Sequence, residues 1–190
     1  MNITKLGIFC GSNTGVDPAY VNAAIDLGKL LAKEGIELIY GGGKVGMMGT
    51  IADAVLKAGG KATGVIPDFL IKKEVGHAGL TTLKVVSSMH ERKLEMARLS
   101  DGFIALPGGF GTFEEIFEAI TWTQLALHQK PCAFLNTKGF YNPVVELIEK
   151  ATTEEFIRAD NAKIVLVSDD SKALLKQMRE WTPPQLPKWI

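Results

Sequence analysis

The sequence predicts an α/β fold of the Rossmann-like, doubly wound type, with a single parallel sheet and helices on both of its faces. Short apolar runs typical of strands alternate with segments of helical periodicity along the chain. Glycines and prolines separate these segments, and no internal repeat or linker interrupts the alternation. Strands that alternate with helices form right-handed βαβ crossovers, which place parallel strands in one sheet.

Each predicted element has a signal in the sequence. Asp17 and Pro18 form an N-cap followed by proline at the first helical position, and Gly35 ends the helix that begins there. Strands are predicted over residues 6–10, 37–40, 61–66, 83–86, 103–106, 132–135 and 164–167. Helices are predicted over residues 18–34, 47–57, 89–99, 112–127, 143–151 and 172–181. The segment 68–81 is expected to be irregular, with some helix.

Length and composition limit the classes of function. A chain of 190 residues is expected to form one domain spanning residues 1–190. The 21 basic and 21 acidic residues give a net charge of zero, so we expect no nucleic-acid partner, and a local site must hold any anion. No apolar stretch approaches the roughly 20 residues of a membrane span, and the N-terminus lacks a secretory signal. We therefore expect a cytoplasmic protein without a membrane partner, in which Cys10 and Cys132 are buried thiols.

Two glycine-rich loops follow the first two predicted strands, where sheets of this type bind ligands. The first loop contains Gly11 and Ser12, whose backbone and hydroxyl can approach a ligand closely; a simple strand-to-helix turn is the alternative. The second has five glycines over residues 41–49, including Gly42 and Gly43, and runs into a helix N-terminus that favours an anion. A flexible surface loop is the alternative there. Neither loop has the pattern of a dinucleotide fingerprint or of a nucleoside triphosphatase loop.

The helix over residues 89–99 carries two adjacent cations, Arg92 and Lys93, on the same face as Met89 and Met96. The methionines could belong to the core while the cations are solvated. The alternative is that both cations point into a cleft and bind phosphate, for which the planar fork of arginine is suited.

A further glycine-rich segment, residues 107–115, follows a strand and opens a helix, which is the context of a phosphate-binding loop. Thr112 and Glu115 have the spacing of a capping box, so both can be explained structurally. The two roles can coexist, because a carboxylate in the first helical turn can also face a bound ligand.

Together these segments resemble the LOG proteins, which are cytokinin riboside 5′-monophosphate phosphoribohydrolases often mislabelled lysine decarboxylases. The matching segments occur in the same order and spacing, from about residue 5 to residue 167. They are Cys10-Gly11-Ser12, Tyr40-Gly41-Gly42-Gly43 with Gly46 and Gly49, Met89-x-x-Arg92-Lys93, and Pro107-Gly108-Gly109-x-Gly111-Thr112-x-x-Glu115.

The resemblance implies a dimer as the minimal unit and the release of a free base and ribose 5-phosphate from a nucleoside 5′-monophosphate. It implies that Arg92 and Glu115 are the catalytic pair. It also implies a substrate site lined by Glu74, Lys93, Gly108, Gly109, Phe110, Gly111, Thr112, Glu114 and Thr121.

No metal or cofactor is expected, because His77, His90 and His128 are scattered and no lysine context indicates pyridoxal phosphate. Two alternatives stay open: a non-catalytic carrier of a nucleotide or cofactor, and an interaction protein. The pairing of an acid with a cation argues against the carrier. The three glycine-rich strand ends would be unexplained in the interaction protein.

Overall fold

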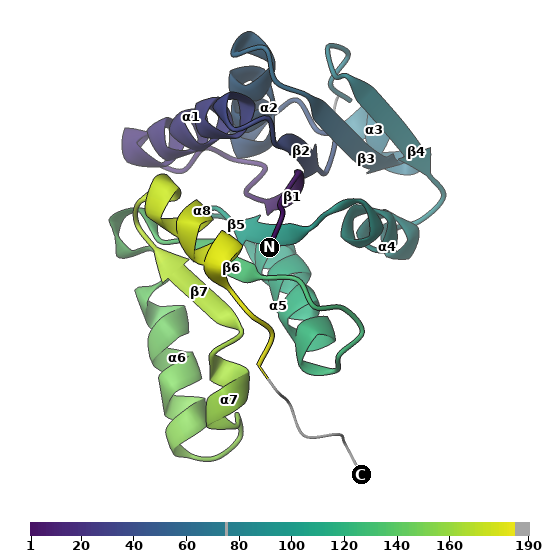
Figure 1. Ribbon diagram of the computed structural model, residues 1–190. Coiled ribbons are helices and arrows are strands. Elements are labelled where there is room, and N and C mark those ends of the chain that lie inside the picture. Colours follow the sequence, from purple (N-terminus) through teal and green to yellow (C-terminus); the bar gives the residue numbers. More distant parts are fainter. Residues whose placement is uncertain (75, 185–190) are drawn as a thin grey trace.

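A single sheet of seven parallel strands forms the centre of the protein, in the order β4-β3-β2-β1-β5-β6-β7 (Figure 1). The computed structural model describes residues 1–74 and 76–184, with residues 72–74 described by their backbone alone. The strands are β1 (Lys5–Phe9), β2 (Glu37–Tyr40), β3 (Ala62–Pro67), β4 (Thr82–Val86), β5 (Gly102–Ala105), β6 (Cys132–Leu135) and β7 (Val165–Ser168).

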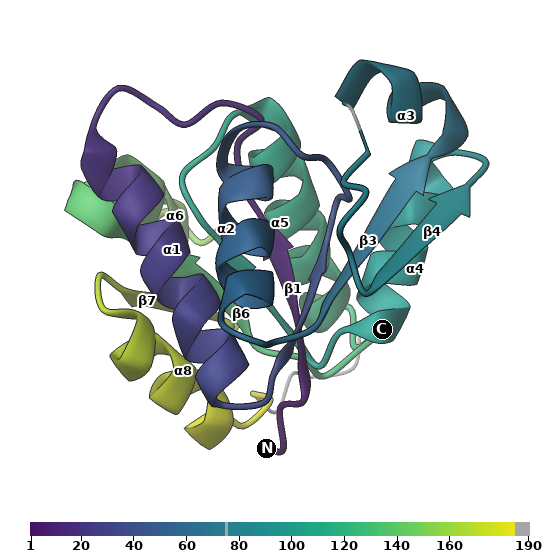
Figure 2. The same cartoon turned by 90° about the horizontal axis from the view of Figure 1, so that it is seen from above.

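Helices cover both faces of this sheet, which confirms the predicted doubly wound α/β fold. The helices are α1 (Pro18–Lys33), α2 (Gly46–Lys57), α3 (Asp68–Glu74), α4 (Met89–Leu99), α5 (Phe110–Gln124), α6 (Asn142–Thr153), α7 (Ala159–Ala162) and α8 (Ser171–Glu180), with a 3-10 turn η1 (Thr137–Gly139). Figure 2 shows α1, α2 and α8 in front of the strands and α5 and α6 behind them.

Side chains along the strands alternate between the two faces of the sheet, and an apolar core lies on each face. In β1, Leu6 and Ile8 join the core under α1, α2 and α8, whereas Phe9 joins the core on the opposite face. Phe9 stacks there on Phe103 of β5, with ring centroids 5.7 Å apart. Side chains that are buried on both faces of every central strand are typical of a parallel sheet covered by helices.

The predicted start of α1 is confirmed. The Asp17 carboxylate accepts a hydrogen bond from the Ala19 N–H at 2.8 Å, and Pro18 is the first helical residue. Gly35 follows the helix with a φ of +70°, as expected of a glycine that ends a helix. The bounds predicted for α4 and β6 are also those observed.

The predicted capping box at Thr112 is wrong. Gly109 is the N-cap of α5, and the Phe113 N–H already donates to the Gly109 carbonyl at 3.0 Å. Thr112 therefore lies inside the first turn, and Glu115 lies in the second turn rather than the first. The segment 68–81 contains α3, and the short elements η1 and α7 were not predicted. The apolar tail at 185–190, expected to pack on the body or on a partner subunit, lies outside the described residues.

The strand order indicates where on the sheet a ligand can bind. Strand β1 pairs with β2 on one side and with β5 on the other, so the chain crosses over in opposite directions from this point. Loops that leave such neighbouring strands diverge and open a crevice at their carboxyl ends. Three of the segments singled out in the sequence lie at this crevice. They are the loops after β1 and β2 and the loop between β5 and α5.

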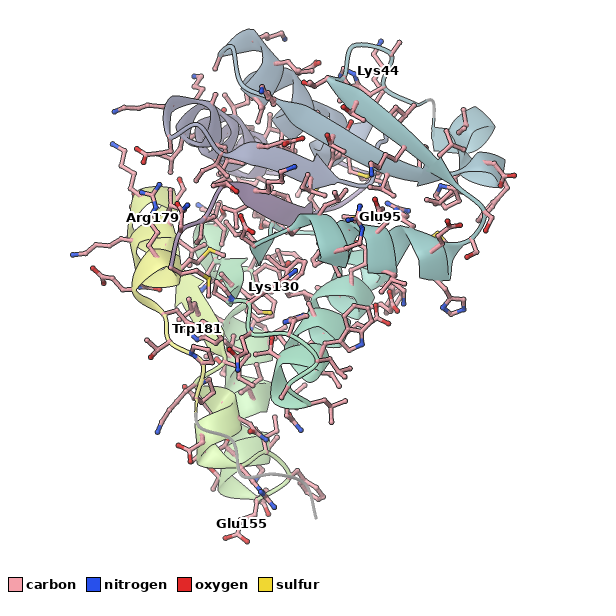
Figure 3. All side chains as sticks on the ribbon, turned by 45° about the vertical axis from the view of Figure 1, so that its right-hand side comes forward. Lys44, Glu95, Lys130, Glu155, Arg179 and Trp181 are labelled. Carbon is pink, nitrogen blue, oxygen red and sulfur yellow. The ribbon has the colours of Figure 1, made fainter. Side chains whose placement is uncertain are left out.

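A partly buried ion pair joins α4 to the edge of the sheet and gives a testable pH dependence. Glu95, labelled on α4 in Figure 3, contacts Lys84 of β4 at 2.6 Å and Arg98 at 2.7 Å. Hydrogen bonds from Arg98 and Lys84 lower the pKa of Glu95 from its ordinary 4.5 to about 2. Its stabilising contribution is thus complete above pH 4.5 and is lost as the pH falls toward 2.

We expect Glu95→Gln to lose less stability than the wild type between pH 4.5 and pH 2, because it has no carboxylate to protonate in this range. Urea unfolding at several pH values measures this. Glu146→Gln, at an exposed position of α6, is the control and should keep the wild-type slope. An acid-induced loss as large in Glu95→Gln as in the wild type would contradict the expectation.

Candidate functional site

A cavity of about 280 Å³ lies at the crevice between the carboxyl ends of β1, β2 and β5. Residues from the loops after all three strands and from α3, α4 and α5 line it. They are Ile8, Cys10, Gly11, Ser12, Gly41, Met48, Leu70, Met89, Arg92, Gly109, Phe110, Gly111, Thr112 and Glu115.

Arg92 reaches this cavity from α4 and is almost fully buried, with 6% of its surface exposed. Helix α4 begins next to the sheet, where the Ser88 hydroxyl caps it by accepting from the Glu91 N–H. Arg92 Nη1 lies 3.7 Å from Met89 Sδ, which is a weak acceptor. Among the described residues, Arg92 Nε has no hydrogen-bond partner. A buried guanidinium with donors to spare favours an anionic or strongly polar ligand.

Glu115 faces Arg92 from the second turn of α5. The nearest approach, from Arg92 Nη2 to Glu115 Oε1, is 4.0 Å, and 12% of the Glu115 side chain is exposed. Burial raises the pKa of the Cys10 thiol above its usual range; Glu115 raises it further and Arg92 opposes the rise. Cys10 is therefore a protonated, unreactive thiol beside the pair. Among the described residues that line the cavity, Arg92 and Glu115 are the charged ones.

The N-terminus of α5 opens into the same cavity. Its N-cap, Gly109, provides no side chain to cap the helix, and the first turn has no acidic residue. Phe110, Gly111 and Thr112 line the cavity at this turn, and the ring of Phe110 is 92% exposed. Free amides at the start of a 15-residue helix, together with its dipole, favour a phosphate.

The first loop also lines an adjoining cavity of about 230 Å³, which shares Gly11, Ser12 and Gly109 with the first. Gly108 lies at this boundary. A Cβ atom on Gly108 would lie 2.1 Å from Thr112 Oγ1, so only glycine lets the loop after β5 fold onto the start of α5. The residues predicted at Gly11, Ser12 and 108–112 thus lie around two adjoining cavities.

The second glycine-rich loop enters the cavity only through Gly41 and, on α2, Met48. Gly42 accepts a hydrogen bond from the His77 N–H, and Gly43 forms a bridge with Gly76. The structure therefore places these two glycines against the segment after α3 rather than among the residues that line the cavity. An anion at Gly42 and Gly43 stays a prediction.

Lys93 and Glu114 contact each other instead of the cavity. The Lys93 ammonium lies between Glu114 and Glu118 of α5, 2.9 Å from the latter, and 13% of its side chain is exposed. Burial lowers the pKa of Lys93, but the hydrogen bonds with Glu114 and Glu118 outweigh it and the pKa is raised. The predicted face of α4 is thus split, with Arg92 on the cavity and Lys93 on α5.

Two predicted residues remain, Thr121 and Glu74. Thr121 is exposed, and its hydroxyl donates to the Phe117 carbonyl at 2.7 Å. The side chain of Glu74 lies outside the described residues. A role for either residue in substrate binding stays a prediction.

The position of Lys93 predicts a mainly structural contribution. We expect Lys93→Met to lower the free energy of unfolding by about 1–3 kcal/mol, between the values for exposed and for buried ion pairs, because two carboxylates lose their shared cation. Urea unfolding of the single variants and of Lys93→Met/Glu118→Gln measures the coupling. Fully additive effects of the two substitutions would show that the ion pair does not form.

Several lining residues were not predicted from the sequence. Met89 shares the predicted face with Arg92, so the helical spacing could have indicated it. Gly41 begins the glycine run in which the sequence predicts only the next two residues, Gly42 and Gly43, as site residues. Leu70 comes from the segment expected to be irregular, and only the fold brings α3 above the cavity.

Two further features are absent from the described residues. No group of three or more histidine, cysteine or acidic side chains there is arranged to hold a metal ion. None of the helices described is at once long and apolar enough to cross a membrane.

Comparisons with known proteins identify the family of this chain. A family model described as "Possible lysine decarboxylase" matches residues 48–178. The chain is 48% identical over 178 residues to a probable cytokinin riboside 5′-monophosphate phosphoribohydrolase of Oryza sativa subsp. japonica, LOGL1, covering 94% of this chain and 80% of that protein. It is 45% identical over 179 residues to the cytokinin riboside 5′-monophosphate phosphoribohydrolase LOG7 of Arabidopsis thaliana, covering 94% and 82%.

Solved structures with the same fold are more distant in sequence. The molybdenum cofactor binding protein of Rippkaea orientalis superposes with a TM-score of 0.69 at 21% identity, over 95% of this chain and 98% of that one. The Moco carrier protein of Chlamydomonas reinhardtii gives 0.69 at 23% identity, over 95% and 100%. At such identities the similarity shows a shared fold alone.

Proposed function

Since this chain belongs to the LOG family of phosphoribohydrolases, we propose that it hydrolyses the N-glycosidic bond of a nucleoside 5′-monophosphate through Arg92 and Glu115. The products are a free base and ribose 5-phosphate. The observation that supports this proposal is the approach of a buried guanidinium to a carboxylate, within 4.0 Å, across a cavity floored by the N-terminus of α5.

Each part of the cavity has a task in this reaction. The uncapped amides of α5 bind the 5′-phosphate, which places the ribose over Glu115. Positive charge builds up on the ribose as the bond from C1′ to the base nitrogen breaks, and the Glu115 carboxylate stabilises that charge and orients a water molecule. The water oxygen attacks C1′, and the water proton ends on the departing base. Arg92 balances the charge of the site while the base leaves.

Purified protein incubated with AMP and with a cytokinin riboside 5′-monophosphate tests the proposal. We expect free base and ribose 5-phosphate in equal amounts from at least one of the two. A wider panel of purine and pyrimidine monophosphates would identify the preferred base. If no member of the panel yields a free base, the proposal is wrong.

A carrier role is the second candidate, because two solved proteins with this fold are named as a binder and a carrier of the molybdenum cofactor. It would be supported by ligand-induced thermal stabilisation without any product. Binding an anion does not require a carboxylate within 4.0 Å of the arginine, since the negative charge of Glu115 opposes it. The paired acid therefore favours hydrolysis.

We propose further that the protein acts in the cytoplasm as a homodimer or a higher homo-oligomer. Large apolar side chains are exposed on α4, on α5 and directly after α5, among them Leu94 at 62% and Leu127 at 69%. Exposed apolar clusters of this kind mark association surfaces. Light scattering of the purified protein should give at least twice the mass of 20.6 kDa, and a monomer would contradict the proposal.

A further inference from the structure

We propose that Gly41 is a positioning residue that makes room for the guanidinium of Arg92, an inference that rests on the proposed function. Gly41 directly follows β2 and is fully buried at the wall of the cavity. The glycine run that begins with it resembles a phosphate-binding loop in sequence. In the structure its first residue serves the arginine instead.

The contact between the two residues is extremely close. A Cβ atom placed on Gly41 would lie 1.9 Å from Arg92 Nη2 and 3.0 Å from Arg92 Cζ. It would lie 3.3 Å from Met48 Sδ, the third-nearest atom. The smallest side chain therefore cannot share this space with the guanidinium in its observed position. Because the guanidinium ends a flexible side chain, the arginine can be displaced without unfolding the sheet.

The backbone does not itself require glycine at this position. Gly42 has a φ of +79°, in the left-handed region where an L-residue is strained, whereas the backbone of Gly41 lies outside that region. Alanine at position 41 is therefore compatible with the main chain. Among the described residues, the one contact below 3.0 Å that a Cβ at position 41 would make is with the arginine.

Displacement of the guanidinium has a direct chemical consequence. Arg92 approaches Glu115 at 4.0 Å, its Nη1 lies 3.7 Å from Met89 Sδ, and its Nη2 lies directly against Gly41. A Cβ atom at position 41 pushes the guanidinium off this position, and a misplacement of about 1 Å is enough to cost on the order of 100-fold in rate. We therefore expect Gly41→Ala to lower kcat by about that factor.

A double-mutant cycle separates this role from a purely structural one. Gly41→Ala, Arg92→Ala and the double variant are compared for base release from the preferred monophosphate and for unfolding in urea. If Gly41 acts through Arg92, Gly41→Ala has an effect of less than about 3-fold on kcat once the guanidinium is absent. Any stability that Gly41→Ala loses relative to the wild type should not be lost by the double variant relative to Arg92→Ala, because the clashing guanidinium is gone.

Gly28→Ala is the matched control. A Cβ atom there would lie 2.8 Å from Ala54 Cβ, between α1 and α2, and Gly28 does not line either cavity described above. We expect this variant to lose stability while kcat stays within about 3-fold of the wild type, and to lose the same stability in the Arg92→Ala background.

The outcomes distinguish this inference from the proposed function. Wild-type kcat in Gly41→Ala, an equal loss in both backgrounds, or failure of the double variant to fold would each overturn the inference. A wild type that releases no base would overturn the proposed function alone. In that case a crystal structure of Gly41→Ala still decides, since an unmoved Arg92 guanidinium contradicts the inference and a displaced one supports it.

Discussion

Glutamine in place of Glu115 is expected to lower kcat by about 1,000-fold or more, with KM within a few-fold of the wild-type value. The substitution preserves shape and removes the negative charge. That charge acts mainly in the transition state, when the ribose is positively charged, so its loss is felt in kcat rather than in substrate binding. Steady-state release of free base from the preferred monophosphate measures the effect.

Glu118→Gln is the matched control for this experiment. Glu118 lies on the same helix, one turn further on, where it contacts Lys93 rather than the cavity. The same loss of one carboxylate should there change kcat by less than about 3-fold while lowering stability slightly. Full activity of Glu115→Gln would remove Glu115 from the mechanism. An unfolded Glu115→Gln would be visible as a lost urea transition.

The architecture could be predicted from the sequence because its signals are local. Asp17 and Pro18 start α1, Gly35 ends it, and each strand is an apolar run bounded by turn residues. Such patterns depend on hydrogen bonds and side-chain burial within a few residues. The start of α5 shows where local signals give a wrong prediction. Thr112 fits a capping box, yet the chain is already helical two residues earlier, because Gly109 can serve as the N-cap without a side chain.

The composition of the cavity was less predictable because it depends on contacts between distant elements. Arg92 and Lys93 are adjacent in sequence and both carry a positive charge, and only the position of α5 decides that one faces the cavity and the other faces Glu114 and Glu118. Leu70 enters from α3, whose helical character was only partly expected. Helical spacing fixes which residues share a face, but it does not fix what that face contacts.

The glycine run after β2 shows the same limit in another way. Three adjacent glycines suggest one loop with one purpose. In the structure Gly41 leaves space for a side chain from α4, Gly42 adopts a left-handed backbone, and Gly43 pairs with Gly76. The sequence could indicate that the backbone is approached closely here. It could not indicate that the approaching group is an arginine of the same chain.

Arg92→Ala is expected to lower kcat for the preferred monophosphate by about 100-fold or more. The guanidinium lies beside Glu115 at the reacting centre, and its removal takes a cation away from a largely enclosed carboxylate. Arg92→Lys restores a positive charge but not the planar fork, so it should recover only part of the activity. Base release by the three proteins, with urea unfolding as the check on folding, measures the series.

The corresponding nucleoside, which lacks the phosphate, distinguishes two roles for this arginine. If Arg92 acts on the reacting centre, as its 4.0 Å approach to Glu115 favours, Arg92→Ala lowers the slow nucleoside reaction by a similar factor. If Arg92 only bound phosphate, the nucleoside reaction would be unchanged and the nucleotide reaction would fall to its level. If Arg92 acts on the reacting centre, the amides of α5 hold the phosphate; otherwise the guanidinium holds it. The ratio of the nucleotide rate to the nucleoside rate in Arg92→Ala therefore decides which group binds the phosphate.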